Sequence, residues 1–210
     1  AKTFPPVTSV MQGIAENFDM EAIAARVRKS LKGLRLAAYY GCLMSRPAEI
    51  MNFGDPENPT LMESMLAACG AEMVDFPLKT ACCGASFGIP ERPMTARNSG
   101  RILDLATQLG VDAVIVACPL CQMNLDLRQP QASKEMGTSF NLPVLYFTQM
   151  MGIAFGLDAQ RCDLGLGGLA VLVDRQVGER HIGAFLGEFK CDGLADAAGC
   201  TRYDSHFSFE

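Results

Sequence analysis

The chain has 210 residues, of which 49% are hydrophobic and 20% charged, a composition typical of a globular protein with one sizeable core. Its net charge of −5 argues against general nucleic-acid binding, which needs a clustered basic surface. Its apolar stretches are too short to span a bilayer, and no basic segment followed by an apolar one opens the chain. We therefore expect no transmembrane segment, no secretory signal and a cytoplasmic location.

The number of cysteines is unusual, because nine in a chain of this length is both high and odd. A chain that can bury a full core does not need disulfide bonds, and no export signal points to an oxidising compartment. Reduced thiols that hold a metal therefore explain the count better than disulfide bonds do.

Residues 1–33 are expected to form a lead-in with one helix. Residues 1–17 are predicted to be irregular. Asp19 can cap a helix that runs to about Leu31 and is ended by Gly33.

Strands and helices then alternate along the chain. The run over 111–117 is continuously apolar and rich in Val and Ile, which is typical of a strand buried on both faces. Asn58 is expected as an N-cap, with Pro59 at the first helical position. The expected strands are residues 34–40, 72–78, 111–117 and 143–145, and the expected helices are 58–69, 94–109, 119–127 and 147–155.

This alternation predicts right-handed βαβ units and hence an α/β fold. We expect an open, mostly parallel sheet of about four strands with flanking helices, of the Rossmann or flavodoxin-like kind. The chain then divides into residues 1–33, a cysteine-rich domain over 34–157 and a C-terminal extension over 158–210. The extension is Gly-rich and expected to be irregular, apart from a short strand that its pattern allows over 169–173.

Five cysteines fall at the ends of predicted strands. Cys42 follows the first strand, Cys82 and Cys83 follow the second, and Cys118 follows the third, with Cys121 three residues further on. The carboxyl ends of parallel strands lie at one edge of the sheet, where such folds bind ligands. Segments far apart in the sequence therefore converge, which predicts a single metal site.

The local sequence also suits a metal site. With Cys118 as N-cap and Pro119 at the first helical position, Cys121 lies in the first turn, where free N–H groups and the helix dipole stabilise thiolates. Gly41 and Gly84 allow the backbone to approach a cluster closely, and N–H groups freed there can donate to cluster sulfides.

Two metals remain open from the residues alone. Five thiolates with no nearby histidine favour iron–sulfur or zinc over harder metals. Structural zinc takes four ligands and would leave one cysteine idle. A redox dithiol of the thioredoxin kind at Cys118 and Cys121 would leave Cys42, Cys82 and Cys83 unexplained.

The other cysteines and the histidines lack such spacing. Cys69 lies on an apolar helix face and is predicted to be a small buried hydrophobic residue. The remaining ones fall in the C-terminal extension and are not expected to bind the metal: Cys162, Cys191, Cys200, His181 and His206.

Three basic residues lie in the loops beside the cysteines. Arg46, Lys79 and Arg92 could attract an anionic substrate or offset the charge of a cluster. Solvated loop charges with no such role explain them equally well.

These motifs resemble a known family. The runs YYGC at Tyr39–Cys42, CCG at Cys82–Gly84 and CPLC at Cys118–Cys121 resemble the cysteine-rich CCG domain. The phrases YYGCLMSRP, DPENPT, CCGASFG, CPLCQMNLD and LPVLYFTQMMGIAFGL, within residues 34–157, are similar to the C-terminal CCG repeat in the B subunit of heterodisulfide reductase.

The resemblance implies a non-cubane [4Fe–4S] cluster held by all five cysteines, Cys42, Cys82, Cys83, Cys118 and Cys121. It implies an oxidoreductase component of anaerobic metabolism, as in methanogenesis, that reduces or forms a thiol disulfide such as the mixed disulfide of coenzyme M and coenzyme B. The implied partners are proteins like the reductase's iron–sulfur C subunit or its flavin-containing A subunit. In the family another CCG repeat precedes this one, so a second chain with such a repeat is a further expected partner.

CCG domains in other complexes provide alternative functions. The chain could be an electron-relay subunit of a flavin-linked 2-hydroxyacid or glycerol-3-phosphate dehydrogenase, or of a heterodisulfide-reductase-like complex of sulfur oxidisers. A structural zinc module that docks partners is a third interpretation.

Overall fold

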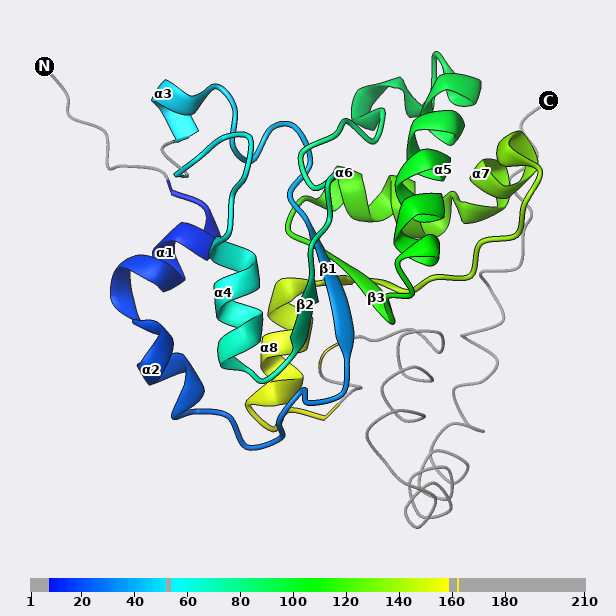
Figure 1. The fold of residues 1–210 in the computed structure, drawn as a ribbon. Helices are drawn as coiled ribbons and strands as arrows, with labels where there is room; N and C mark the ends of the chain where they lie inside the picture. The colour runs from blue at the N-terminus through cyan, green and yellow to red at the C-terminus, as the bar shows by residue number, and fades with distance from the viewer. Residues whose placement is uncertain (1–7, 52–53, 159–161, 163–210) are drawn as a thin grey trace, which may run out of the picture.

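The computed structural model describes residues 8–51, 54–158 and 162 (Figure 1). At its centre is a parallel sheet with the strand order β2-β1-β3-β4. Its strands are β1 (Arg35–Tyr39), β2 (Glu72–Val74), β3 (Ala113–Val116) and β4 (Val144–Tyr146). The predicted α/β fold with an open parallel sheet is confirmed.

The strand order has a reversal beside β1. The chain leaves β1, forms β2 on one side, and then crosses β1 to form β3 on its other side. Ala37 is accordingly paired with Val74 of β2 and with Val114 of β3. In open α/β sheets this kind of reversal creates a crevice at the carboxyl ends of the two diverging strands, and ligands bind there.

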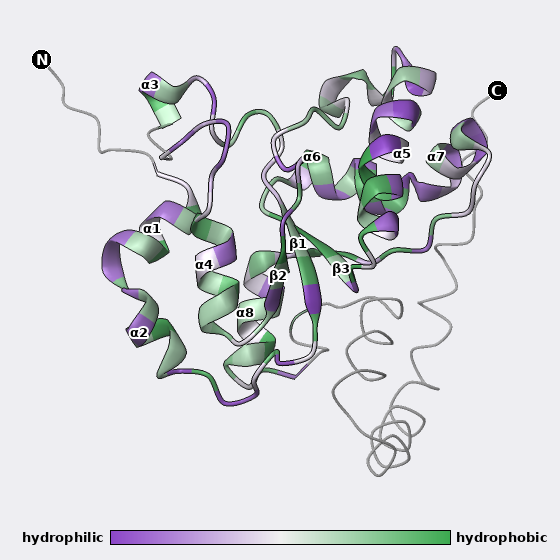
Figure 2. Cartoon of the chain, in the orientation of Figure 1, coloured by the Kyte–Doolittle hydropathy of each residue, from purple (hydrophilic) through white to green (hydrophobic). Residues whose placement is uncertain are grey.

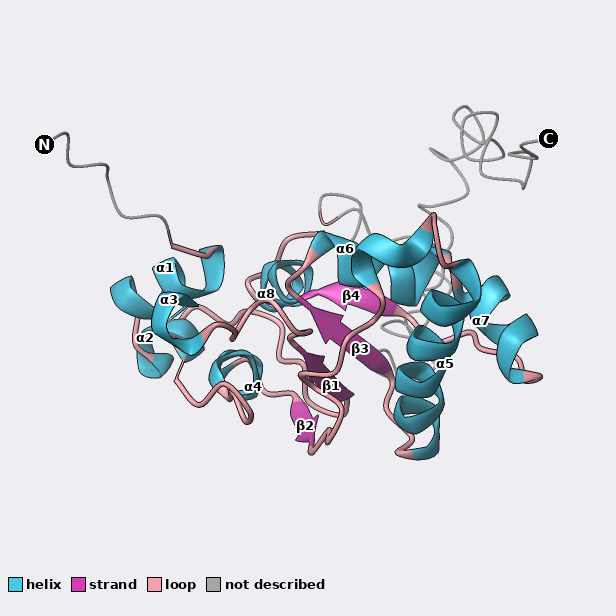
Figure 3. Cartoon of the chain, turned by 90° about the horizontal axis from the view of Figure 1, so that it is seen from above, coloured by secondary structure: helices cyan, strands magenta, loops and turns pink. Residues whose placement is uncertain are grey.

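Helices lie on both sides of the sheet (Figure 3). α4 and α8, with α1 and α2 outside them, cover one face, and α5 and α7 cover the other. The helical elements are α1 (Val10–Asn17), α2 (Met20–Ala24), α3 (Ala48–Met51), α4 (Leu61–Ala68), α5 (Arg92–Gln108), α6 (Pro119–Gln122), α7 (Gln129–Met136) and α8 (Phe147–Ala154), with a 3₁₀ turn η1 (Ala85–Gly88) and a π-helical segment η2 (Met123–Leu127).

Most residues of β1 and β3 are apolar, as the colours in Figure 2 show. Leu36 and Ala38 pack toward α4 and α8, whereas Ala37 and Tyr39 pack toward α5. Because alternate residues of a strand point to opposite faces, one apolar run supplies both cores. The prediction that the third strand is buried on both faces is confirmed, since every residue of β3 is buried.

The N-terminal region differs from its prediction. Residues 10–17 were expected to be irregular but form α1, because Ser9 and Gln12 make a capping box in which each side chain bonds the other's backbone N–H. The next helix ends at Ala24 instead of Leu31. The backbone N–H groups of Arg28 and Lys29 donate instead to the carbonyl of Ala154, at 2.8 and 3.0 Å, which stops the helix from continuing.

Other boundaries also shift. α4 begins at Leu61 with Thr60 as its N-cap, so the predicted start at Asn58 and Pro59 is wrong by two residues. β2 ends at Val74, well short of the predicted residue 78. Two helices that we did not predict, α3 and α7, fill the connections after β1 and before β4.

The division into three regions is a prediction that the structure does not test. The strand expected over 169–173 lies outside the described residues. Within the described ranges, no helix combines the length and the apolar character needed to cross a bilayer.

Candidate metal centre

The five predicted cysteines meet at the carboxyl edge of the sheet. Cys42 follows β1, Cys118 follows β3, and Cys121 lies in α6. Cys82 and Cys83 follow a turn after β2 and precede η1, from which Gly84 separates them.

Tyr39, at the end of β1, is a common neighbour of four of these thiols. Its hydroxyl is buried and donates to the carbonyl of Ala81 at 2.6 Å. Burial first, and then electrostatic interaction with Cys121, Cys83, Cys82 and Cys42, raises the pKa of Tyr39 above its ordinary value. The Tyr39 hydroxyl therefore interacts electrostatically with cysteines from three separate segments of the chain.

The sulfur atoms of Cys83 and Cys121 lie 3.6 Å apart, although the two residues come from different loops. Gly41 lies beside the Cys121 sulfur. Its φ is +70°, and a Cβ added there would be 2.7 Å from the Cys121 sulfur. A glycine is needed at this position both for its backbone conformation and for space.

Two of the thiols are acidic. The pKa of Cys118 is lowered to about 5, chiefly by a hydrogen bond from the Cys121 thiol and also by the backbone N–H groups of Cys121 and Leu120. The pKa of Cys83 is lowered to about 6, again chiefly by Cys121, with further donors in Asn124 and the Ala85 backbone. Both sulfur atoms are thiolates at neutral pH, which is the form that ligates metal.

Cys121 differs from its prediction. We expected the helix N-terminus to make both Cys118 and Cys121 thiolates, but Cys121 keeps its proton, since its hydrogen bonds to Cys118 and Cys83 raise its pKa. Cys42 also has a raised pKa, caused first by burial and then by Cys82.

The loop that carries Cys82 and Cys83 is tied to α5. Ser99 donates to the carbonyl of Cys83 at 3.1 Å, and Thr95 donates to that of Gly84 at 3.3 Å. Gly84 has a φ of +86°, and a Cβ there would lie 2.9 Å from the Cα of Thr95. Gly84 therefore allows the loop to approach α5 closely, and its backbone N–H donates to the Cys82 sulfur at 3.3 Å.

Gly41 has no free N–H for a cluster, contrary to our expectation. The N–H groups of Tyr40 and Gly41 both donate to the carbonyl of Lys79, at 2.8 and 3.0 Å. The Lys79 ammonium is buried and paired with Glu63 at 2.8 Å. Glu63 also accepts from the Tyr40 hydroxyl, so this network fixes the backbone just before Cys42.

Two of the three basic residues that were predicted to have electrostatic roles pair with carboxylates of this chain. Lys79 is committed to Glu63, and Arg46 pairs with Glu57 while its other nitrogen donates to the carbonyl of Thr80 at 3.4 Å. Arg92 is exposed at the start of α5.

The cysteine predicted to be structural lies in the core. Cys69 is 1% exposed, and burial raises its pKa to about 11. Cys162 is also buried, against Gly152 of α8. The predictions for Cys191, Cys200, His181 and His206 fall outside the described residues.

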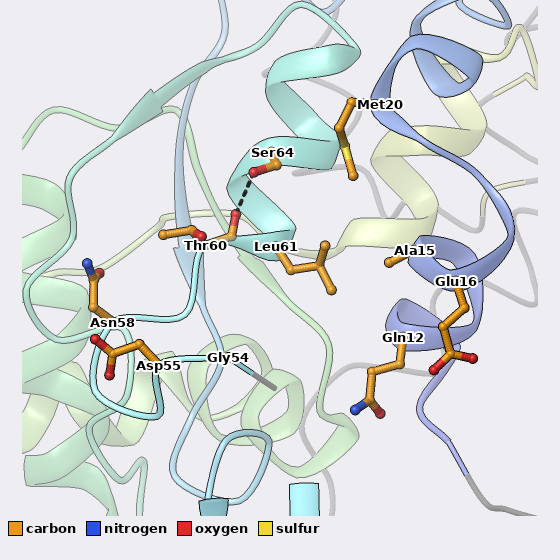
Figure 4. Close-up of a pocket in the computed structure, with 10 residues that line it drawn as sticks. All are labelled: Gln12, Ala15, Glu16, Met20, Gly54, Asp55, Asn58, Thr60, Leu61 and Ser64. Carbon is orange, nitrogen blue, oxygen red and sulfur yellow. Dashed lines mark hydrogen bonds between the residues drawn. The ribbon is translucent and has the colours of Figure 1, made fainter. Parts of the chain in front are cut away.

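A cavity of about 540 Å³ lies elsewhere, between α1, α2 and the start of α4 (Figure 4). Gln12, Glu16, Asp55 and Asn58 are among the residues that line it. None of the described residues that line it is a cysteine, so the cavity is distinct from the candidate metal centre.

The cysteine edge suits a metal–sulfur group. It offers soft donors from three segments, two thiolates already formed and a glycine beside a sulfur. In the part of the chain that the structure describes, however, no three His, Cys, Asp or Glu side chains are arranged to hold a single ion. The identity of the metal group therefore stays a proposal.

Residues 36–126 match the family described as a cysteine-rich domain, CCG. The chain is 34% identical over 160 residues to the 8-methylmenaquinol:fumarate reductase membrane anchor subunit of Wolinella succinogenes, an alignment that covers 76% of this chain and 55% of that protein. It is 31% identical over 154 residues to the B subunit of the ferredoxin:CoB-CoM heterodisulfide reductase of Methanosarcina mazei, covering 71% of this chain and 50% of that protein.

A further B subunit, from the ferredoxin/F(420)H(2)-dependent CoB-CoM heterodisulfide reductase of Methanosarcina acetivorans, is 34% identical over 127 residues, covering 59% of this chain and 42% of that protein. The chain thus spans about half the length of the curated relatives it matches. All five converging cysteines lie inside the matched residues 36–126. The chain therefore carries a cysteine-rich CCG domain and is a homologue of the B subunit of heterodisulfide reductase.

Proposed function

We propose that the chain is the iron–sulfur subunit of a heterodisulfide-reductase-like complex that reduces, or forms, a thiol disulfide. Its five cysteines at the sheet edge would hold one non-cubane [4Fe–4S] cluster: Cys42, Cys82, Cys83, Cys118 and Cys121. The convergence of these residues from three segments at one sheet edge is the observation that carries the proposal.

The protein's own residues prepare the site. Cys83 and Cys118 can bind iron without first losing a proton, because both are already acidic. Cys121, which hydrogen-bonds to both, would have to lose its proton to bind iron as a thiolate. When bound, the cluster would supply single electrons to a disulfide sulfur at the crevice beside β1.

The similarity to subunits of reductase complexes supports a proposal for partners and substrate. We propose a small thiol or disulfide substrate and two kinds of protein partner, acting in the cytoplasm. One partner would be like the reductase's iron–sulfur C subunit, the other like its flavin-containing A subunit. The chain would correspond to the C-terminal CCG repeat, with another such repeat supplied by a second chain or by sequence beyond this one.

Metal analysis of anaerobically purified chain tests the proposal. We expect about four iron and four sulfide per chain, as a [4Fe–4S] site requires, and an EPR signal that changes when a thiol substrate is added. Replacing any of the five cysteines by Ser should lower the iron content, whereas Cys69→Ala, a matched control at a buried thiol, should leave it unchanged. Near-zero iron with stoichiometric zinc would contradict the proposal and favour the structural zinc module.

An electron-relay role is the second candidate, and one observation favours it. The relative from Wolinella succinogenes is a subunit of a fumarate reductase, whose named substrate contains no disulfide. We therefore extend the comparison to relay subunits of flavin-linked 2-hydroxyacid or glycerol-3-phosphate dehydrogenases and of sulfur-oxidising complexes. The reduced, iron-loaded chain separates the two roles, because a disulfide reductase should be reoxidised by a small disulfide and a relay only by its protein or quinone-linked partner.

A further inference from the structure

Asn124 connects the segment that carries Cys121 to the loop that carries Cys83. It lies in η2, three residues after Cys121, and its side chain is fully buried. The amide nitrogen Nδ2 lies 3.6 Å from the Cys83 sulfur, 3.5 Å from the Cys83 carbonyl oxygen and 3.4 Å from that of Ala85.

These neighbours determine which way the amide faces. The carbonyl oxygens of Cys83 and Ala85 can only accept hydrogen bonds. The reversed amide would point its own oxygen at these two acceptors, so the NH₂ group must face the cysteine loop and the Cys83 sulfur.

The other end of the amide makes no bond. Among the described residues, Asn124 Oδ1 is the one buried side-chain nitrogen or oxygen that has no hydrogen-bond partner. An apolar residue of similar size would fit beside the buried Leu125 without this unsatisfied acceptor. Packing alone therefore does not explain an asparagine here, whereas a need for the NH₂ donor at Cys83 does.

We propose that Asn124 is a positioning residue that holds the Cys83 sulfur and tunes the reduction potential of the metal group it binds. This inference rests on the proposed function. An N–H donor stabilises negative charge on a ligand sulfur, and the reduced cluster carries one more negative charge than the oxidised one. The donor should therefore stabilise the reduced form more and raise the potential.

Asn124→Leu and Asn124→Asp test this proposal. Leu keeps the size but has no donor, and an ionised Asp replaces the donor by a negative charge. Gln129→Leu is the matched control, because Gln129 is also a buried amide but bonds the backbone of Leu142, at 2.6 and 3.0 Å. Midpoint potentials of the anaerobically loaded variants are measured by EPR-monitored redox titration, and iron per chain is measured alongside.

We expect both Asn124 variants to have a lower potential than the parent chain, with Asp lower than Leu, and Gln129→Leu to match the parent even if it unfolds at a lower temperature. Equal potentials in the parent chain and both Asn124 variants would overturn the inference. So would a shift of the same size in Gln129→Leu.

A second measurement needs no metal, so it separates this inference from the proposed function. In the metal-free chain, Cys83→Ala should move the NMR resonances of the Asn124 side-chain amide more than Cys42→Ala does. Equal movement would overturn the contact between Asn124 and Cys83. A parent chain that takes up no iron would instead contradict the proposed cluster. The NMR comparison would still decide whether Asn124 contacts Cys83.

Discussion

A glycine at the cysteine edge can be required for its backbone conformation or for the space beside a sulfur atom, and a matched pair of glycines separates these two effects. Gly41 and Gly33 both have positive φ, +70° and +92°, but only an added Cβ at Gly41 meets another group, the Cys121 sulfur. Gly41→Ala and Gly33→Ala should each cost about 1–2 kcal/mol of unfolding free energy from backbone strain. Only Gly41→Ala should also lower iron uptake, as measured by iron per chain. Equal iron in the two variants would show that Cys121 can move freely.

Cys69 allows a prediction about pH. Its folded pKa of about 11 lies above its ordinary value of 9.0, because burial disfavours the thiolate. A raised acid pKa contributes stability that is fully present below the unfolded pKa and is lost as pH rises toward the folded one. At about pH 9, near the ordinary thiol pKa, iodoacetamide should modify Cys69 in the unfolded chain but not in the native chain. Mass spectrometry of the alkylated peptides checks this, and rapid native labelling would contradict it.

The five cysteines could be predicted from the sequence because each segment directly follows a recognisable strand or its turn. Asn124, Thr95 and Ser99 could not be predicted, since a polar residue on the inward face of a helix has no pattern that identifies its partner. The partner of Lys79 could not be predicted for the same reason. Its partner, Glu63, comes from a different helix, and only the tertiary structure brings the two together.

At the scale of elements, the long apolar runs predicted the sheet and α5, α6 and α8, whereas short elements depended on details. The Ser9–Gln12 capping box that starts α1 was present in the sequence but was missed. The early end of α2 could not be predicted. It is caused by hydrogen bonds to the carbonyl of Ala154, a residue far away in the sequence that only the fold brings close.

The cap of α1 can be tested directly. Ser9→Ala removes the acceptor for the Gln12 N–H and should lower the unfolding free energy by about 1 kcal/mol. Urea denaturation followed by circular dichroism measures the change. Ser9→Asp, which keeps an acceptor, should lose much less, and an equal loss in both would argue against the cap.

The pair of Lys79 and Glu63 links the turn after β2 to α4. Its side chains are 9% and 19% exposed. Lys79→Met leaves the Glu63 carboxylate largely buried without its cation and should cost about 3 kcal/mol of unfolding free energy. Adding Glu63→Gln removes that charge and should recover part of the loss in chemical denaturation. A double variant less stable than Lys79→Met would contradict this account.

On the scale of the whole molecule, the proposed function requires electrons to enter and leave near the cysteines, so partners should bind at this edge of the sheet. Exposed apolar side chains are present there, with Phe87 and Ile89 in and after η1 being 50% and 78% exposed. Phe87→Ser with Ile89→Ser should weaken binding to the iron–sulfur partner protein about tenfold or more, as central apolar contacts do. Val10→Ser on α1, also exposed, serves as the control. Binding is measured by biolayer interferometry. An equal loss of affinity in the control variant would contradict the prediction.

The strand order around β1 means that a metal group bound at the cysteine edge would also affect the stability of the fold. The loops after β1, β2 and β3 are far apart along the chain but close together in space. Any group bonded to cysteines in all three acts as a cross-link, which removes far more freedom from the unfolded chain than from the folded one. The proposed cluster would then both carry electrons and cross-link the fold. Damage to the cluster by oxygen would therefore also destabilise the loops at the carboxyl ends of the strands.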